Sequence, residues 1–368
     1  MAQTEIQARL TSWLSELMAI PGLSGFEDRV RGYIKSELAK LGLASRGDRL
    51  GNLIATLDGD ISKPAVMLIA HMDQLGLIVR KIEASGFIRV ERVGGVPEKA
   101  LPAQEVVLAL HSGRTLPGVI ANKSHHATLP EERYEVVPYR DLYVDCGFAS
   151  AEEARAAGVG IGTPVTYAPR AIELANGRIG GTAVDDRAAC AVLLEVARAA
   201  KQGRHLPPIH LVFSVQEEFN LRGAVTAAQT LMPDIAIQLD LVLATDTPDM
   251  ASRGEVRLGG GPAVSLYSFH GRGTLNGCIP HPALVRLFEE AAAHEKLPLQ
   301  RSVHTGALTE TSYVQLVGAG VACIDLGFPC RYTHSAREVC DLADLECLAR
   351  LVLAGLGRIG RGFELDRP

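Results

Sequence analysis

The residues best suited to chemistry in this chain are two adjacent carboxylates, Glu217 and Glu218. They follow the apolar run 211–215, which has the composition of a buried β-strand. Side chains that are adjacent at a strand end diverge, so the two glutamates could serve one site in different roles. One could hold a metal ion while the other takes a proton from the water that the metal activates. A solvated acidic turn could have the same two residues. Whether the pair forms a metal site therefore depends on other potential ligands in the chain.

A histidine and an aspartate stand at the end of an earlier strand. His71 and Asp73 follow the apolar run 65–70, and they would lie on the same face if the strand continued through them. Asp73 could then hold the second ring nitrogen of a ligating His71 imidazole. A strand-end histidine followed by a helix-capping aspartate would need no metal.

An aspartate pair precedes the helix predicted over residues 188–200. Asp185 and Asp186 stand where aspartates commonly cap a helix or complement its dipole. Because a carboxylate has two oxygens, one of this pair could instead bridge two cations. The sequence pattern by itself allows both interpretations.

Two isolated residues, Asp240 and His334, complete the set. Asp240 ends the strand predicted over residues 235–239, and His334 follows the segment 320–329. Alone, each would be an ordinary strand-end or surface residue. All five segments together supply two histidines and several carboxylates from separate strands, which suits zinc, cobalt or manganese better than magnesium or calcium. Two histidines and three carboxylates suffice for two metal ions if one carboxylate bridges them.

The elements that must position these residues alternate between strand and helix. Helices are predicted at 6–18, 30–41, 188–200, 224–231, 282–293 and 342–356. Strands are predicted at 53–57, 65–70, 209–215, 235–239 and 320–326. This alternation predicts an α/β sheet with helices on both faces, in which ligands gather at the carboxyl ends of the strands.

The pattern changes between residues 76 and 167. Short strands are predicted at 77–80, 86–93, 105–109 and 118–121, with a helix near 151–157. Glycine and proline turn signals separate them. We therefore predict a β-rich insertion at 76–167 within a catalytic domain formed by residues 1–75 and 168–368.

The composition excludes several classes of protein. Of the 368 residues, 47% are hydrophobic and 21% charged, which permits a sizeable core. A net charge of −5 without a Lys/Arg block argues against nucleic-acid or membrane partners. Seven cysteines without a C-x-x-C motif favour a reducing compartment over a disulfide framework. Because no signal peptide or 18-residue apolar run is recognised, we expect a cytoplasmic protein.

Five stretches of the chain, in order, resemble peptidase family forty-two, the tetrahedral co-catalytic aminopeptidases. They are AHMDQLGLIV, GTAVDDRAACAVLLE, SVQEEFNLRGA, IAIQLDLVLATDTP and RYTHS, while GVIANKSHH and DLYVDCG resemble that family's inserted domain. The resemblance covers nearly the whole chain. It implies a zinc-exopeptidase-like α/β catalytic domain with a mixed sheet, and a β-barrel-like dimerisation domain at 76–167. It also implies dimers that assemble into a tetrahedral dodecamer, whose chamber admits short peptides.

The resemblance further implies a role for each candidate residue. Five resemble metal ligands: one ion is held by His71 and Asp240, the other by Glu218 and His334, and both by Asp185. Asp73 resembles the carboxylate that orients His71, and Glu217 resembles the general base. The implied cofactor is two divalent metal ions per chain, with zinc favoured and cobalt or manganese as alternatives. The implied reaction removes the N-terminal residue from short peptides.

The chain departs from the family pattern in three places. Gln74 replaces a common glutamate, Phe219 and Asn220 replace Val-Gly, and Leu-Thr-Glu-Thr at 308–311 replaces a Gly-Thr-Asp-Ala segment near the substrate pocket. Since the ligand set is intact, we expect hydrolysis, with the side-chain specificity left open. A specialised hydrolase of a small modified dipeptide is one alternative.

Two other classes of function compete with the aminopeptidase. Paired carboxylates also perform glycoside hydrolysis, as in endoglucanases. The histidines argue against this, because a glycosidase needs no His71 or His334 as ligands. A non-catalytic shell protein could retain the metals and lose turnover through its altered segment at 308–311.

Overall fold

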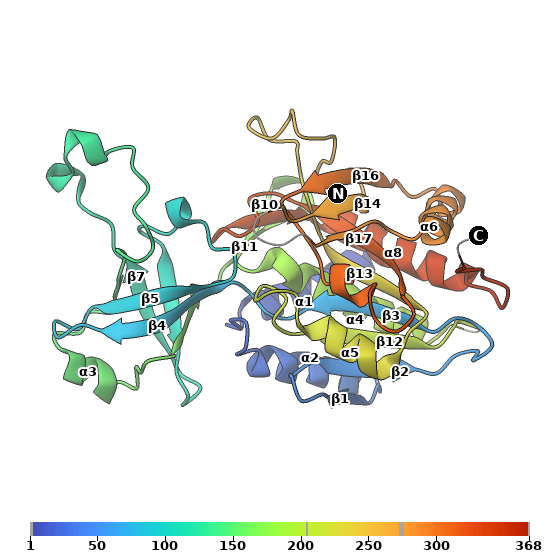
Figure 1. The fold of residues 1–368 in the computed structure, drawn as a ribbon, viewed down its shortest axis with the longest axis horizontal. Coiled ribbons are helices and arrows are strands. Elements are labelled where there is room, and N and C mark those ends of the chain that lie inside the picture. The colour runs from blue at the N-terminus through green and yellow to red at the C-terminus, as the bar shows by residue number, and fades with distance from the viewer. Residues whose placement is uncertain (1–2, 204, 272–275, 367–368) are drawn as a thin grey trace.

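The computed structural model describes residues 3–203, 205–271 and 276–366, which form a layered α/β region and a separate β-barrel (Figure 1). Among these residues, the α/β region contains a nine-stranded sheet in the order β1, β2, β12, β3, β13, β17, β14, β15, with β16 paired to β14. The bounds are β1 Ser45–Gly47, β2 Leu53–Leu57, β3 Val66–His71, β12 Ile209–Ser214, β13 Ile235–Leu243, β14 Ala263–Phe269, β15 Gly277–Cys278, β16 Gln300–Thr305 and β17 Ala322–Cys330.

The sheet is mixed, as predicted. The four central strands β12, β3, β13 and β17 are adjacent and parallel. The pairings of β2 with β12 and of β14 with β17 are antiparallel. Parallel neighbours end at the same edge of a sheet, so the carboxyl ends of the four central strands lie together.

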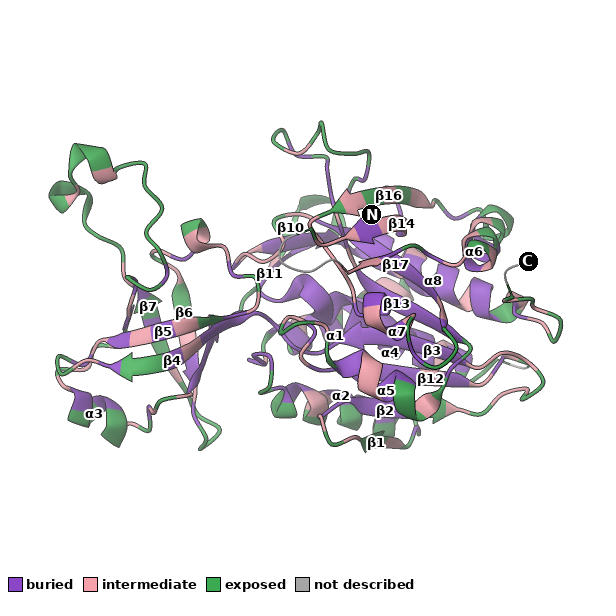
Figure 2. Cartoon of the chain, in the orientation of Figure 1, coloured by how far each residue is buried: buried purple, intermediate pink, exposed green. Residues whose placement is uncertain are grey.

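Helices cover both faces of this sheet because its central strands are apolar on both sides. Along β3, Val66, Leu68 and Ala70 belong to the core beneath one layer of helices, while Met67 and Ile69 belong to the core of the opposite face. The first layer contains α1 Glu5–Met18, α2 Asp28–Lys40, α4 Val184–Ala200, α6 Pro282–Glu295 and α8 Leu342–Arg358. The second contains α5 Gly223–Leu231 and α7 Thr311–Val314. Figure 2 shows the buried sheet between them.

The predicted boundaries hold to within a few residues, with one difference that affects the site. Strand β13 was expected to end at residue 239, but it continues to Leu243 because Leu241, Val242 and Leu243 prolong the apolar run. Asp240 therefore lies inside the strand rather than after it. The sequence patterns also missed β14, β16 and a small sheet of β10 Ala171–Leu174, β11 Arg178–Gly181 and β18 Glu338–Asp341.

The β-barrel has its own core. Its strands close in the order β4, β5, β8, β7, β6, β9. The bounds are β4 Gly76–Ile82, β5 Ile88–Val93, β6 Glu105–Ala109, β7 Thr115–Ile120, β8 Val144–Asp145 and β9 Pro164–Tyr167, and α3 Ala151–Ala156 packs against them. Between β7 and β8 the chain projects from the barrel through two 3-10 turns, His125–Ala127 and Pro130–Glu132 (Figure 1). No helix among the described residues is both long and apolar enough to span a bilayer.

Candidate active site

The carboxyl edge of the four parallel strands brings the predicted residues together. His71 is the last residue of β3, Asp240 lies within β13, and the two glutamates follow β12. His334 follows β17, and Asp185 comes from the start of α4. All six line one cavity of about 770 Å³, a volume that suits a small ligand or a short peptide.

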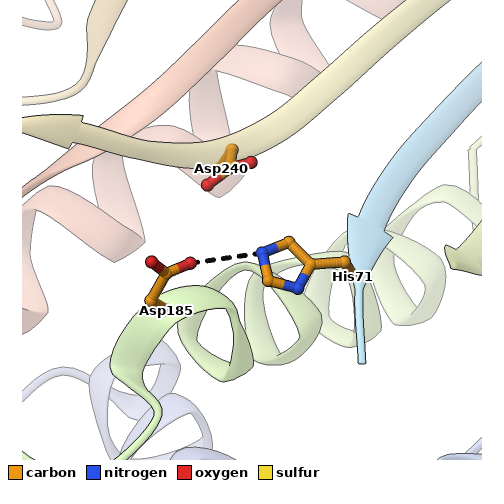
Figure 3. A group of neighbouring side chains, drawn as sticks. All are labelled: His71, Asp185 and Asp240. Carbon is orange, nitrogen blue, oxygen red and sulfur yellow. Dashed lines mark hydrogen bonds and ion pairs between the residues drawn. The ribbon is translucent and has the colours of Figure 1, made fainter. Parts of the chain in front are cut away.

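Asp185 lies between two groups of potential ligands. Its Oδ1 is 3.2 Å from His71 Nε2, and its Oδ2 is 3.6 Å from His334 Nε2. One group is His71, Asp185 and Asp240, and the other is Asp185, Glu218 and His334; within each, the ligand atoms all lie within 4.8 Å of one another. Figure 3 shows the first group, with three side chains from separate elements directed toward a common space.

Both imidazole rings are held through Nδ1, which leaves Nε2 facing the cavity. His71 Nδ1 is 3.1 Å from the carbonyl oxygen of Asp73, and His334 Nδ1 is 3.0 Å from that of Gly95. A carbonyl can only accept, so Nδ1 carries a proton in each ring, and Nε2 is the nitrogen that a metal ion would bind in place of a proton. A Cβ at Gly95 would lie 2.8 Å from His334 Nδ1, so this approach requires glycine.

Asp73 connects the His71 ring to both glutamates. Its Oδ1 is 3.4 Å from His71 Nδ1, and its two oxygens accept hydrogen bonds from the backbone N–H groups of Glu217 and Glu218 at 3.0 and 3.1 Å. The Ser24 hydroxyl donates a further hydrogen bond to it. Strand β3 ends at His71, so strand alternation does not produce this contact. Asp73 reaches the ring from the loop.

The aspartate pair does not cap its helix. Asp185 and Asp186 both have non-helical backbone angles, and no side chain caps the start of α4. Asp185 accepts a hydrogen bond from the Thr333 hydroxyl at 2.9 Å, and Asp186 accepts one from the His71 backbone N–H at 3.2 Å. Asp185 therefore faces the cavity, whereas Asp186 is fully buried and contacts the backbone of β3.

Glu338 is a buried residue of the site that the sequence analysis missed. It accepts hydrogen bonds from the backbone N–H groups of Asp185 at 2.9 Å and His334 at 2.7 Å. It thereby fixes the backbone that carries two potential ligands. The structure buries all four residues of the short strand β18 that carries it, and the sequence offered no local signal for this role.

The electrostatics of the cluster favour a bound cation. Burial raises the pKa of Glu217 and Asp240 well above the usual range of a carboxyl group, and it raises the pKa of Glu218 to about 7. Burial lowers the pKa of His71, but hydrogen bonds to Asp185 and Asp73 outweigh this and raise it. So many buried carboxylates cannot all be ionised without positive charge nearby. Imidazole and carboxylate donors in this arrangement fit divalent ions of the zinc type.

The departures from the family pattern have different surroundings. Asn220 lines the cavity, while Phe219 is half-exposed with the Arg222 guanidinium 5.6 Å from its ring centroid. Gln74 is buried and accepts a hydrogen bond from the backbone of Gly22 at 3.1 Å. In the segment 308–311, Leu308 and Thr309 line the cavity.

Glu310 turns inward from the same segment. It is fully buried and accepts hydrogen bonds from the Ser214 hydroxyl at 2.5 Å and the Ala224 backbone at 2.6 Å. It therefore anchors the end of β12 and the start of α5, on either side of the two glutamates.

Two relatives of this chain align with it over almost their whole length. The SgcX protein of Escherichia coli K12 is 39% identical over 96% of this chain and 95% of its own. The lysyl aminopeptidase of Pyrococcus furiosus is 31% identical over 93% of this chain and 95% of its own.

Solved structures share the complete fold. An aminopeptidase of Desulfurococcus kamchatkensis superimposes with a TM-score of 0.91 at 32% identity, covering 98% of this chain and 97% of that one. The TET1 peptidase of Pyrococcus horikoshii, which assembles into a tetrahedron or an octahedral shell, gives 0.84 at 28% identity over 94% and 99%. A Thermotoga maritima protein described as an endoglucanase gives 0.73 at 32% identity over 94% and 96%.

A family model places the chain among these proteins. The model of the M42 glutamyl aminopeptidases matches residues 51–351, which include every candidate ligand and the barrel. This match agrees with the resemblance found in the five sequence stretches. The chain therefore belongs to the M42 peptidase family and is an aminopeptidase.

Proposed function

We propose that the protein is a dinuclear metal-dependent aminopeptidase that removes the N-terminal residue from short peptides. The observation that carries this proposal is the position of Asp185, whose two oxygens face two different imidazoles. In this proposal His71 and Asp240 hold one ion, Glu218 and His334 hold the other, and Asp185 bridges them. Family membership supports metal dependence, and zinc is the proposed metal, with cobalt or manganese as alternatives.

Glu217 is the proposed general base. When bound, two divalent ions lower the pKa of a water molecule and polarise the scissile carbonyl. Of the two adjacent glutamates, Glu217 is the one that belongs to neither ligand group. Its Oε2 lies 4.0 Å from Nε2 of the potential ligand His71. It accepts the proton of the attacking water and later donates it to the leaving amine. Asp73 positions this residue through the backbone hydrogen bond to Glu217.

A substrate panel with controlled metal content tests the function. We expect aminoacyl-anilides and dipeptides to be hydrolysed by protein loaded with zinc, cobalt or manganese. Chelation should lower the rate at least about 100-fold, since the ions supply the charge stabilisation. N-acetylated forms of the same substrates should resist cleavage, because an exopeptidase of this type requires a free N-terminal amine.

Two outcomes of the panel would contradict the proposal. The relative described as an endoglucanase is the reason to include cellulose oligomers. Hydrolysis of these oligomers that survives complete metal removal would favour a glycosidase. Two bound ions per chain without hydrolysis of any peptide would favour a non-catalytic shell protein.

We further propose that residues 76–167 form a dimerisation domain and that the dimers assemble into a dodecamer. The TET1 relative supports this, as do exposed apolar side chains on the projecting segment of the barrel. Tyr134 is 95% exposed, and Leu129, Val136 and Val137 are each 42–53% exposed. A soluble monomer rarely displays so many apolar side chains on one arm.

Light scattering of the metal-loaded protein should give a mass near that of twelve chains of 39.3 kDa. Val136→Asp should shift the population to smaller species, because it places a charge in the proposed interface. Ile61→Asp is the matched control, since Ile61 is 92% exposed and lies outside the barrel. A monomeric wild type would contradict the proposed dodecamer but not the proposed aminopeptidase activity.

A further inference from the structure

Asp325 is a buried carboxylate of the cavity that the proposed mechanism does not use. It lies in β17, is 5% exposed, and lines the same cavity as the potential metal ligands. It belongs to neither ligand group. A buried carboxylate in a ligand cavity costs free energy unless a partner compensates it, so its presence calls for an explanation.

The strand register places Asp325 on the strand next to that of Asp240, a proposed metal ligand. In the parallel pairing of β13 with β17, Asp240 is opposite Gly327 and Gln238 is opposite Asp325. Asp325 is therefore one strand across from Asp240 and two residues further from the carboxyl edge. The usual strand spacing and rise put their Cα atoms about 8 Å apart. That distance matches the reach of a long side chain on a substrate whose peptide bond lies at the metal ligands.

Hydroxyl groups continue from Asp325 across the sheet. Ser265 of β14 is opposite Asp325, and Ser302 of β16 is opposite Ser265. Both serines line the cavity. This wall is therefore polar, and an apolar side chain entering here would remove water from these groups without replacing their hydrogen bonds.

A chain of two threonine hydroxyls holds the carboxylate of Asp325 in place. The buried Thr311 hydroxyl donates a hydrogen bond to Oδ1 at 2.5 Å, and Thr309 in turn donates its hydroxyl hydrogen to Thr311 at 2.7 Å. Both threonines belong to the segment 308–311, in which the sequence departs from the family pattern. Among the described residues, no lysine or arginine is an ion-pair partner of Asp325. Its negative charge is thus oriented but not neutralised.

Two described residues of the cavity that can carry a positive charge, Arg253 and His304, do not pair with Asp325 in the sheet. Arg253 is exposed, so solvent screens its charge more strongly than that of Asp325. His304 is opposite Ser268 and lies two residues beyond Ser302 on β16, so it is further than Ser302 from Asp325 along the sheet. The described residues next to Asp325 are thus neutral hydroxyls around one carboxylate, and a cationic ligand is the chemical class that they fit.

We propose that Asp325 binds the ammonium or guanidinium group of a basic first residue and selects peptides that begin with lysine or arginine. This inference rests on the proposed aminopeptidase function and names the substrate class of that site. Asp325 acts on specificity, since it contacts the end of the substrate side chain and not the peptide bond.

The test compares lysyl- and norleucyl-anilide, whose side chains have the same carbon chain with and without the ammonium group. We expect wild type to prefer the lysyl substrate by at least about tenfold in kcat/KM, since a buried charge-assisted hydrogen bond is lost with norleucine. Asp325→Asn should abolish that preference and change kcat/KM for norleucine by less than about threefold. The amide oxygen can still accept the hydrogen bond from Thr311, so the pocket should keep its shape.

The control and the other outcomes separate the explanations. Glu5→Gln makes the same charge change on the exposed surface of α1 and should keep the lysine preference. Equal losses on both substrates in Asp325→Asn would place the substrate α-amine at Asp325 and overturn the proposal, as would a wild type that does not prefer lysine.

A binding measurement keeps the inference separate from the proposed function. If wild type cleaves no aminoacyl substrate, the proposed function fails. Calorimetry with free L-lysine and L-norleucine then still tests Asp325. Equal affinity of wild type for the two amino acids would overturn the inference by itself.

Discussion

Glu217→Gln is expected to retain both metal ions and to lower kcat by about 10²–10⁴-fold, the usual contribution of a general base. Glutamine is nearly isosteric with glutamate but cannot accept a proton at neutral pH. Because Glu217 is outside both ligand groups, its loss leaves every proposed metal donor in place. The measurement is kcat with a saturating aminoacyl-anilide, together with the metal content of the same sample.

The neighbouring residue provides the matched control for this experiment. Glu218→Gln makes the same chemical change one position later, but it removes a member of the second ligand group. We expect this variant to lose metal as well as turnover. Wild-type turnover in Glu217→Gln would disprove the assigned base, and loss of metal from Glu217→Gln alone would exchange the two roles.

Asp185→Asn should have the second large effect, because it alters the one residue common to both ligand groups. The amide keeps one oxygen and presents an uncharged NH₂ group where the second oxygen faced His334. We expect the affinity for the metals to fall at least about 100-fold, equivalent to about 2.7 kcal/mol. Titration of metal-free protein, followed by activity at each metal concentration, measures both consequences.

Asp186→Asn is the control for that variant. Its amide oxygen can still accept the hydrogen bond from the His71 backbone, and Asp186 belongs to neither ligand group. It should therefore bind two ions. If Asp185→Asn bound two ions as tightly as Asp186→Asn does, the bridging role would be wrong.

The clustering of the candidate residues could be predicted because it depends on short-range patterns. Alternating strands and helices predict parallel neighbours, and parallel neighbours end at one edge. His71, Glu217 and Glu218 follow or end apolar runs, so their meeting follows from the fold class. The division of roles between the two glutamates came from the family resemblance, since adjacent strand-end residues have no local feature that distinguishes them.

Other parts of the site depend on pairing between distant segments and could not be predicted. Asp325 lies within an apolar run, and its place in the cavity follows from the register of β17 against β13 and β14. Glu338 lies in a four-residue strand that pairs with β11. Strand β16 has alternating exposure, and the sequence around it offers no strong strand signal. In each case a contact between remote segments decides the role.

The insertion of the barrel after β3 has a consequence for the order in which the chain folds during synthesis. The described neighbours of β3 in the sheet are β12 and β13, which begin at residues 209 and 235. At about 5–20 residues per second, β3 therefore waits on the order of ten seconds before its first partner is translated. During that interval both edges of this apolar strand lack their final partners, whereas the barrel strands, which are nearly contiguous in sequence, can close. The barrel is thus expected to be folded on the ribosome before the active site exists.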